Sequence, residues 1–141
     1  MSPSESNPDL QSYRLQGVDA VRQAAGAARA FAEAEWLDDD ELARLCIVVE
    51  ELVANLYDHG GLKTEDIVQL GIARDPAGIR VSITDPGAPF DPWSTLLGVD
   101  RPDRGGGVGI EIVRSWAEFI SYHTTTEGNQ LEFLLPIHWK E

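Results

Sequence analysis

The chain has 141 residues, of which 43% are hydrophobic, and this suits one domain with a real core. Its formal net charge of −13 argues against nonspecific binding to nucleic acid or to anionic membranes, because both reward lysine and arginine, while it permits a partner with a basic surface. The single cysteine excludes a disulfide framework, and no segment resembles a signal peptide or a membrane span, so we expect a cytoplasmic protein.

A leader, a strand and a helix are predicted at the start of the chain. Residues 1–9 are polar and contain prolines, so we expect a flexible leader there and one domain over residues 10–141. Residues 10–17 alternate weakly and predict a strand at a sheet edge. Residues 18–36 have helix composition, and their small residues would let another element pack close: Ala24, Ala25, Gly26 and Ala28.

A second helix and a hairpin are predicted next. The helix begins after Asp38, a plausible N-cap that is followed by acidic residues, and it ends at Gly60 and Gly61. Residues 66–87 then predict two strands that are joined by a turn at residues 75–78.

The remaining chain predicts an irregular segment over residues 91–104, a glycine-rich loop that leads into a third helix, and a hairpin over residues 120–137. The hairpin turns near Glu127, Gly128 and Asn129. Strands therefore pair locally and helices come between them. This order predicts an α/β (α+β) fold, a two-layer sandwich of a mixed, mostly antiparallel sheet with helices on one face.

Polar residues line one face of the second predicted helix. At about 100° per residue, Glu51, Asn55 and Asp58 fall opposite the apolar face. Such a face is usually just solvated, but Ile47 and Val48 flank Glu51 on its own side, which indicates a covered cleft instead. An asparagine carbonyl can ligate Mg²⁺, and a glutamate can accept a proton from a hydroxyl or from water.

Glycines gather directly before the third predicted helix, at Gly105, Gly106, Gly107 and Gly109. Glycine lets a ligand approach the backbone, and the first amides of a helix lack internal partners, so this stretch could hold an anion. Two other glycine-rich motifs do not apply. The dinucleotide fingerprint needs a strand just before it, and the Walker loop needs a Gly-Lys-Ser/Thr ending.

Three stretches, taken in chain order, carry the motifs Glu51-x-x-x-Asn55, Asp85-x-Gly87-x-x-Phe90 and Gly105-x-Gly107-x-Gly109. They resemble the N box and the two glycine boxes of the Bergerat-fold ATPases, the superfamily of gyrase and the histidine kinases. Each motif alone is weak, but their order and spacing agree over most of the chain. The resemblance implies the Bergerat fold, with ATP and Mg²⁺ as cofactors.

The resemblance also implies roles for the matched residues. Asp85 would accept a hydrogen bond from the adenine amino group, Gly87 would let the base approach, and Asn55 would ligate Mg²⁺. Without the resemblance, the same Asp-Pro-Gly stretch is an ordinary turn. The other expected nucleotide-binding residues are His59, Phe90, Gly105, Gly107, Val108 and Gly109, the amides of the second glycine box holding the phosphates. His59 has the equally good interpretation of a cation at the C-terminal end of the helix, or of a turn residue.

Within the superfamily, the chain most resembles the anti-sigma-factor serine/threonine kinases of bacterial partner switching. We expect a bare ATPase domain. His59 and Gly60 follow the asparagine as in that group, and the stretch between the glycine boxes is short. The resemblance implies a homodimer that sequesters a sigma factor or similar regulator. It also implies phosphorylation of a serine or threonine on a STAS-domain anti-sigma-factor antagonist, with Glu51 as the general base.

The sequence departs from that group at two places. Asn129 and Gln130 follow Gly128, where the family often has a threonine near the adenine, and Gly106 stands where many relatives have a basic residue. The alternative function is a nucleotide-gated regulatory binding module with little or no phosphotransfer. A third interpretation, an α/β domain with accidental motifs, needs three coincidences in order.

Overall fold

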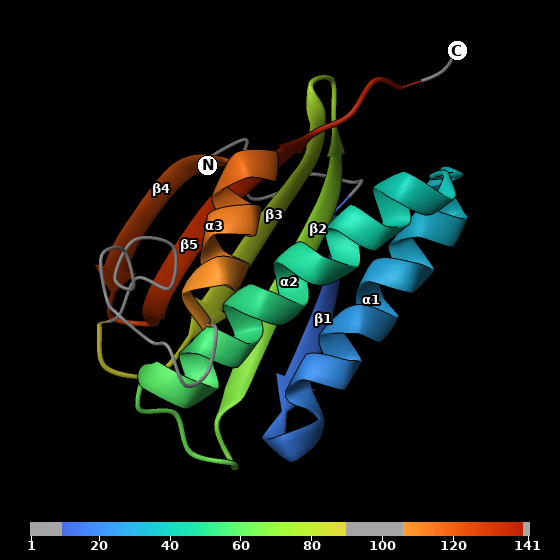
Figure 1. Cartoon of the computed structure of the whole chain (residues 1–141). Helices are drawn as coiled ribbons and strands as arrows, with labels where there is room; N and C mark the ends of the chain where they lie inside the picture. The colour runs from blue at the N-terminus through green and yellow to red at the C-terminus, as the bar shows by residue number, and fades with distance from the viewer. Residues whose placement is uncertain (1–9, 90–105, 140–141) are drawn as a thin grey trace.

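The computed structural model describes residues 10–89 and 106–139, which form a sheet and a layer of helices on one of its faces (Figure 1). In chain order the elements are β1 (Gln11–Gln16), the 3-10 turn η2 (Gly17–Asp19), α1 (Ala20–Glu35), α2 (Asp39–His59), β2 (Ile67–Asp75), β3 (Gly78–Asp85), α3 (Gly106–Trp116), β4 (Glu118–Thr125) and β5 (Gly128–Pro136). The strands lie in the order β1-β2-β3-β5-β4, and neighbours pair antiparallel. The predicted fold class is confirmed.

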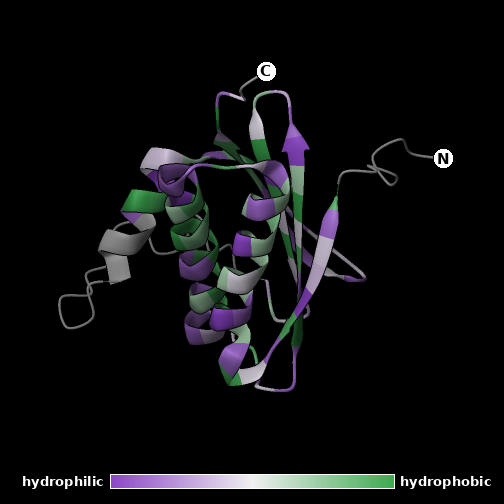
Figure 2. Ribbon diagram, turned by 90° about the vertical axis from the view of Figure 1, so that its right-hand side faces the viewer, coloured by the Kyte–Doolittle hydropathy of each residue, from purple (hydrophilic) through white to green (hydrophobic). Residues whose placement is uncertain are grey.

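The hydrophobic core lies between the two layers, which Figure 2 shows from the side. Alternate residues of the central strands face the helices, as the period of two in a strand requires. In β5 these are Leu131, Phe133 and Leu135, all buried, whereas the residues between them are half-buried. The helices contribute Phe31 from α1 and Leu52 from α2 to the same core. Burial of this apolar surface is the main favourable term in folding.

Helix α2 begins and ends where the sequence predicts. The Oδ1 atom of Asp38 accepts a hydrogen bond from the backbone amide of Glu41 over 2.8 Å, and Oε1 of Glu41 accepts one from the amide of Asp38 over 2.9 Å. This reciprocal capping box satisfies two amides that lack helical partners. At the other end, the amide of Gly60 donates to the carbonyl of Leu56 over 2.8 Å and closes the last turn.

Helix α1 differs from its prediction in two ways. It begins at Ala20, because residues 17–19 form the turn η2. Ala24 and Ala28 are fully buried, as expected of small residues that pack closely, but Gly26 is exposed and has nothing within 4 Å of the position that a Cβ would take. The expectation of close packing at Gly26 was therefore wrong.

Helix α3 begins earlier than predicted. Gly107, Val108 and Gly109, which we expected in a loop, lie in its first turns because the helix begins at Gly106. Glycine disfavours a helix by about 1 kcal/mol relative to alanine, so sequence propensity places the boundary after the last glycine. Burial of Val113 farther along the helix anchors it and offsets this cost.

Four of the predictions concern residues outside the described ranges: the leader 1–9, Phe90, the segment 91–104 and Gly105. A search of the described helices for one that is both long enough and apolar enough to span a membrane found none.

Candidate functional site

Asp85, the last residue of β3, is a buried carboxylate with a defined set of donors. Its side chain is buried, and its Oδ1 atom accepts hydrogen bonds from the backbone amide of Gly87 over 2.9 Å and from Nδ2 of Asn129 over 3.2 Å. Burial raises the pKa of the Asp85 carboxyl above its usual value, the two hydrogen bonds lower it, and the nearby Asp66 carboxylate raises it. The site therefore holds a hydrogen-bond acceptor in a desolvated place.

The β4–β5 hairpin packs closely against Asp85. A Cβ on Gly128 would stand 2.5 Å from the carbonyl oxygen of Asp85, and the φ angle of Gly128 is +133°, so this position needs glycine. Asn129 follows and is 1% exposed. Its Nδ2 also donates to the carbonyls of Gly87 over 2.9 Å and of Ala88 over 3.2 Å. The hairpin thus forms one wall of the Asp85 site.

Sequence reasoning did not include Asn129 among the site residues, because it treated the residue as a departure at a turn. Strand β5 begins at Gly128, so Asn129 occupies a strand position and pairs with Asp85 in the β3–β5 register. A signal was present in the sequence. Asn129, Leu131, Phe133 and Leu135 alternate on one face, and a polar residue in such an apolar series is expected to have buried partners.

The segment between α2 and β2 packs against the turn that follows β3. A Cβ on Gly87 would stand 2.8 Å from Cδ2 of Leu62 and 3.0 Å from the carbonyl oxygen of Gly60. Gly87 is therefore glycine at least in part because the chain itself approaches there; an approach of a base to the same backbone stays a prediction. This packing sets the C-terminal end of α2 beside the end of β3.

Asp66 holds that same segment in place. Its Oδ2 atom accepts a hydrogen bond from the amide of Lys63 over 2.8 Å, and its carbonyl accepts one from the hydroxyl of Tyr57 over 3.1 Å. The first bond closes the segment on itself, and the second ties it to the last turn of α2. These two hydrogen bonds thus hold the segment that contacts Gly87.

The polar stripe on α2 is only partly solvated. Asn55 is 4% exposed, and its Nδ2 atom has no hydrogen-bond partner among the described residues. Glu51, one turn earlier, is half-buried, and Asp58 is exposed. The hypothesis of a covered cleft beside apolar surface therefore fits Asn55, whereas a solvated face fits Asp58. A buried amide without a partner is costly, which is consistent with a site built to receive a polar ligand.

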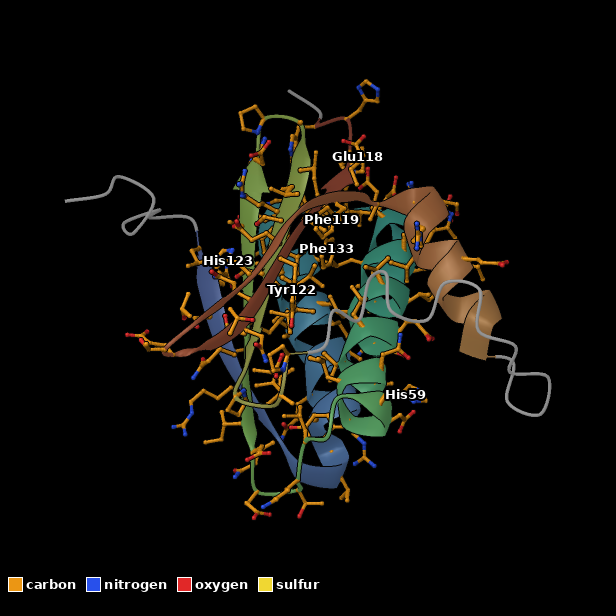
Figure 3. The ribbon with its side chains drawn as sticks, turned by 90° about the vertical axis from the view of Figure 1, so that its left-hand side faces the viewer. His59, Glu118, Phe119, Tyr122, His123 and Phe133 are labelled. Carbon is orange, nitrogen blue, oxygen red and sulfur yellow. The ribbon has the colours of Figure 1, made fainter. Side chains whose placement is uncertain are left out.

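Helix α3 packs against α2, and its amino end lies toward the C-terminal half of α2 (Figures 1 and 3). The backbone amides of Gly107, Val108 and Gly109 belong to the start of this helix, where amides lack helical partners and carry positive partial charge. The predicted anion site is thus carried by the start of a helix instead of a loop. Phosphate binding there stays a prediction.

His59 is the last residue of α2 and is half-buried (Figure 3). It stands in the last turn, where a cation interacts favourably with the helix dipole, so both of its interpretations stay open. Its role in nucleotide binding remains a prediction.

The described residues could hold a Mg²⁺ ion only together with a ligand that supplies further oxygens. Within residues 10–89 and 106–139, no group of three or more His, Cys, Asp or Glu side chains is placed to hold a metal. Mg²⁺ is commonly bound by one or two protein oxygens and by substrate phosphates. Asn55 would supply the protein oxygen through its side-chain carbonyl, so the residues present fit an ion that arrives with a phosphate-bearing ligand.

Comparison with known proteins agrees with this fold. A solved structure, the histidine kinase domain from Erythrobacter litoralis EL346 blue-light activated histidine kinase, is similar over 82% of this chain, with a TM-score of 0.50 and 17% sequence identity, which shows a shared fold. Our chain spans 60% of the length of that one. A search of curated proteins found no match. A family model described as a histidine kinase-like ATPase domain matches residues 16–135, which include α2, Asp85, α3 and Asn129, and the chain therefore belongs to that family.

Proposed function

We propose that this protein is an ATP-dependent serine/threonine protein kinase that also acts as an anti-sigma factor in a partner-switching module. The family is one of ATPase domains, which implies ATP binding, and the finer assignment rests on the resemblance of the motifs. One observation carries the proposal: Asn55 is buried, and its Nδ2 atom has no hydrogen-bond partner in the described part of the chain. It lies one turn after Glu51 on a helix whose end packs against the turn after Asp85. Helix α3, which carries Gly107 and Gly109 of the third motif, also packs against α2.

Each side chain has a role in this proposal. Asp85 accepts the adenine amino group, Asn55 holds Mg²⁺, and the first amides of α3 hold the phosphates. Glu51 accepts the proton of a serine or threonine hydroxyl as that oxygen bonds to the γ-phosphorus of ATP, and ADP leaves with the electrons of the broken P–O bond. When bound, Mg²⁺ neutralises charge on the phosphates.

The proposed partners follow from the same assignment. The phosphate acceptor is a STAS-domain anti-sigma-factor antagonist, and the sequestered partner is a sigma factor or a similar regulator, held by a homodimer of this chain. The net charge of −13 suits a partner with a basic surface, because opposite potentials steer association.

The experiment is phosphate transfer from radiolabelled ATP, with Mg²⁺, to a STAS-domain antagonist that is encoded beside this gene. We expect label on the antagonist, and loss of label with Glu51→Gln while the Kd for ATP stays unchanged. Glu50→Gln is the matched control, because it makes the same change on the neighbouring half-buried glutamate.

The outcomes separate the candidate functions. Tight ATP binding with no label on the antagonist would favour a nucleotide-gated binding module over a kinase. Absence of ATP binding by the wild-type protein would overturn both.

A further inference from the structure

The buried Asn129 side chain has hydrogen-bond partners among the described residues at both ends of its amide. Its Nδ2 atom lies within hydrogen-bond distance of Oδ1 of Asp85 and of the carbonyls of Gly87 and Ala88, so its two hydrogens are shared among three acceptors. Its own Oδ1 accepts from the hydroxyl of Thr124 over 2.9 Å. These partners fix the orientation of the amide. The reversed orientation would set a carbonyl oxygen against three oxygens and leave the hydroxyl without an acceptor.

The donors that Asp85 receives from described residues, Gly87 and Asn129, both end on Oδ1. A carboxylate has acceptor sites on both oxygens, so Oδ2 can accept a hydrogen bond from a further donor. Rotation of the carboxylate plane away from this orientation would break the bond from Asn129. The Asn129 side chain therefore restrains the direction in which the second carboxylate oxygen points.

The same amide also positions the wall beside the carboxylate. Its bonds to the carbonyls of Gly87 and Ala88 hold the turn after β3 at a fixed place relative to Asp85. In addition, the bond from Asn129 lowers the pKa of Asp85, against the rise caused by burial. Asn129 thus favours an ionised Asp85, which accepts a hydrogen bond and cannot donate one.

We propose that Asn129, oriented by Thr124, is a positioning residue that holds Asp85 so that the site selects 6-amino purines over 6-oxo purines. This inference rests on the proposed function, because it assumes that Asp85 faces the base of a nucleotide. A fixed, ionised acceptor bonds to an exocyclic amine and repels a carbonyl oxygen at the same place. Asn129 does not itself have to touch the base.

The test compares the Kd values of ATP, ITP and purine riboside triphosphate, each with Mg²⁺, by calorimetry. ITP carries an oxygen at position 6, and the purine analogue carries no substituent there. For Asn129→Leu we expect ATP binding to weaken roughly tenfold or more while binding of the purine analogue changes less than about twofold, since a bond to a charged group is lost only with ATP. The preference for ATP over ITP should fall as well.

A milder pair of variants keeps the test valid if Asn129→Leu does not fold. Thr124→Val removes the hydroxyl that orients the amide, and we expect a smaller loss of selectivity in the same direction. Thr126→Val is the matched control, because it makes the same chemical change at an exposed position of the same hairpin. Equal weakening of ATP and of the purine analogue in either test variant would show a merely structural role and overturn the inference.

A second measurement needs no nucleotide. We expect the pKa of Asp85, followed by carbon NMR of its carboxyl, to rise in Thr124→Val and Asn129→Leu, and to stay constant in Thr126→Val. An unchanged pKa in both test variants would also contradict the positioning role. If the wild-type protein binds no nucleotide, the proposed function fails with the selectivity claim, whereas the NMR result still reports whether Asn129 holds Asp85.

Discussion

The carbonyl oxygen of Gly60 stands 3.0 Å from the position that a Cβ atom on Gly87 would occupy. Helix α2 carries Glu51 and Asn55, and this close approach places its C-terminal end against the turn that follows Asp85. Two motifs that are separated in the sequence are thus held together by backbone packing where a side chain would not fit.

Gly87→Ala should therefore destabilise the protein. The added methyl would meet the Gly60 carbonyl and Leu62, so we expect the free energy of unfolding to fall by about 1–3 kcal/mol, which is typical of overpacking. The control is Gly26→Ala, since Gly26 is exposed in the middle of α1 with open space around it. That change should raise the free energy of unfolding by about 0.5–1 kcal/mol. Urea unfolding measures both, and an equal or higher stability of Gly87→Ala would contradict the packing.

The two buried asparagines should respond in opposite ways to replacement by leucine. The Nδ2 atom of Asn55 has no hydrogen-bond partner among residues 10–89 and 106–139, so Asn55→Leu removes an uncompensated polar group and should leave the free energy of unfolding unchanged or raise it by about 1 kcal/mol. Asn129 has partners at both ends of its amide, so Asn129→Leu should lower the free energy by about 2 kcal/mol or more.

Both asparagine variants are measured by urea unfolding without nucleotide and then with Mg²⁺ and ATP. The added ligand should stabilise the wild-type protein and have little effect on Asn55→Leu, because binding to the folded state alone raises stability. Equal destabilisation by the two substitutions would mean that the Asn55 amide is paired in solution.

Local patterns predicted most of the fold. The capping box depends on Asp38 and Glu41, three positions apart, and the hairpin at residues 75–78 depends on turn residues beside two apolar strands. Such features are determined by near neighbours, so the sequence pattern predicted them. The predicted start of α3 after the glycines was wrong, because the helix begins at Gly106, where tertiary packing outweighs helix propensity.

The contacts that make the candidate site are long-range, and the sequence did not predict them. Asn129 lies 44 residues from Asp85 and 41 from Ala88, and only the β3–β5 register brings them together. Similarly, no local pattern indicates that Leu62 packs on Gly87. The motifs predicted which residues matter at Asp85 and Asn55, and the structure was needed to find what holds them.

The capping box of α2 offers a test of how the helix that carries Glu51 and Asn55 is anchored. Asp38→Ala removes a side-chain acceptor at the N-cap and should cost about 0.5–2 kcal/mol of unfolding free energy. Because Glu41 makes the reciprocal bond, the double variant with Glu41→Ala should cost less than the sum of the single variants. Asp39→Ala is the control, in the first turn but outside the box. Strict additivity of the two changes in thermal unfolding would argue against the reciprocal pair.

The raised pKa of Asp85 predicts a direction for the pH dependence of stability. Burial raises the pKa of the carboxyl in the folded state, so between the unfolded pKa of about 3.9 and the higher folded value the folded state binds more protons. This group's contribution to stability is therefore full below the unfolded pKa and is lost as the pH rises through the folded pKa. Asp85→Asn keeps an acceptor for Gly87 and Asn129 but does not ionise, so its melting temperature relative to the wild type should increase with pH.

The comparison needs melting temperatures without nucleotide from about pH 3 to pH 8, so that the range begins below the unfolded pKa of the carboxyl. Glu127→Gln is the control, since it makes the matching acid-to-amide change at an exposed position in the β4–β5 turn. A wild-type protein that gains stability relative to Asp85→Asn as the pH rises would mean that the Asp85 pKa is lowered and not raised. With Mg²⁺ and ATP present, the order should reverse at neutral pH, because only the wild type offers the ionised acceptor to the base. The ionised Asp85 that nucleotide binding needs is thus expected to lower the stability of the protein without nucleotide.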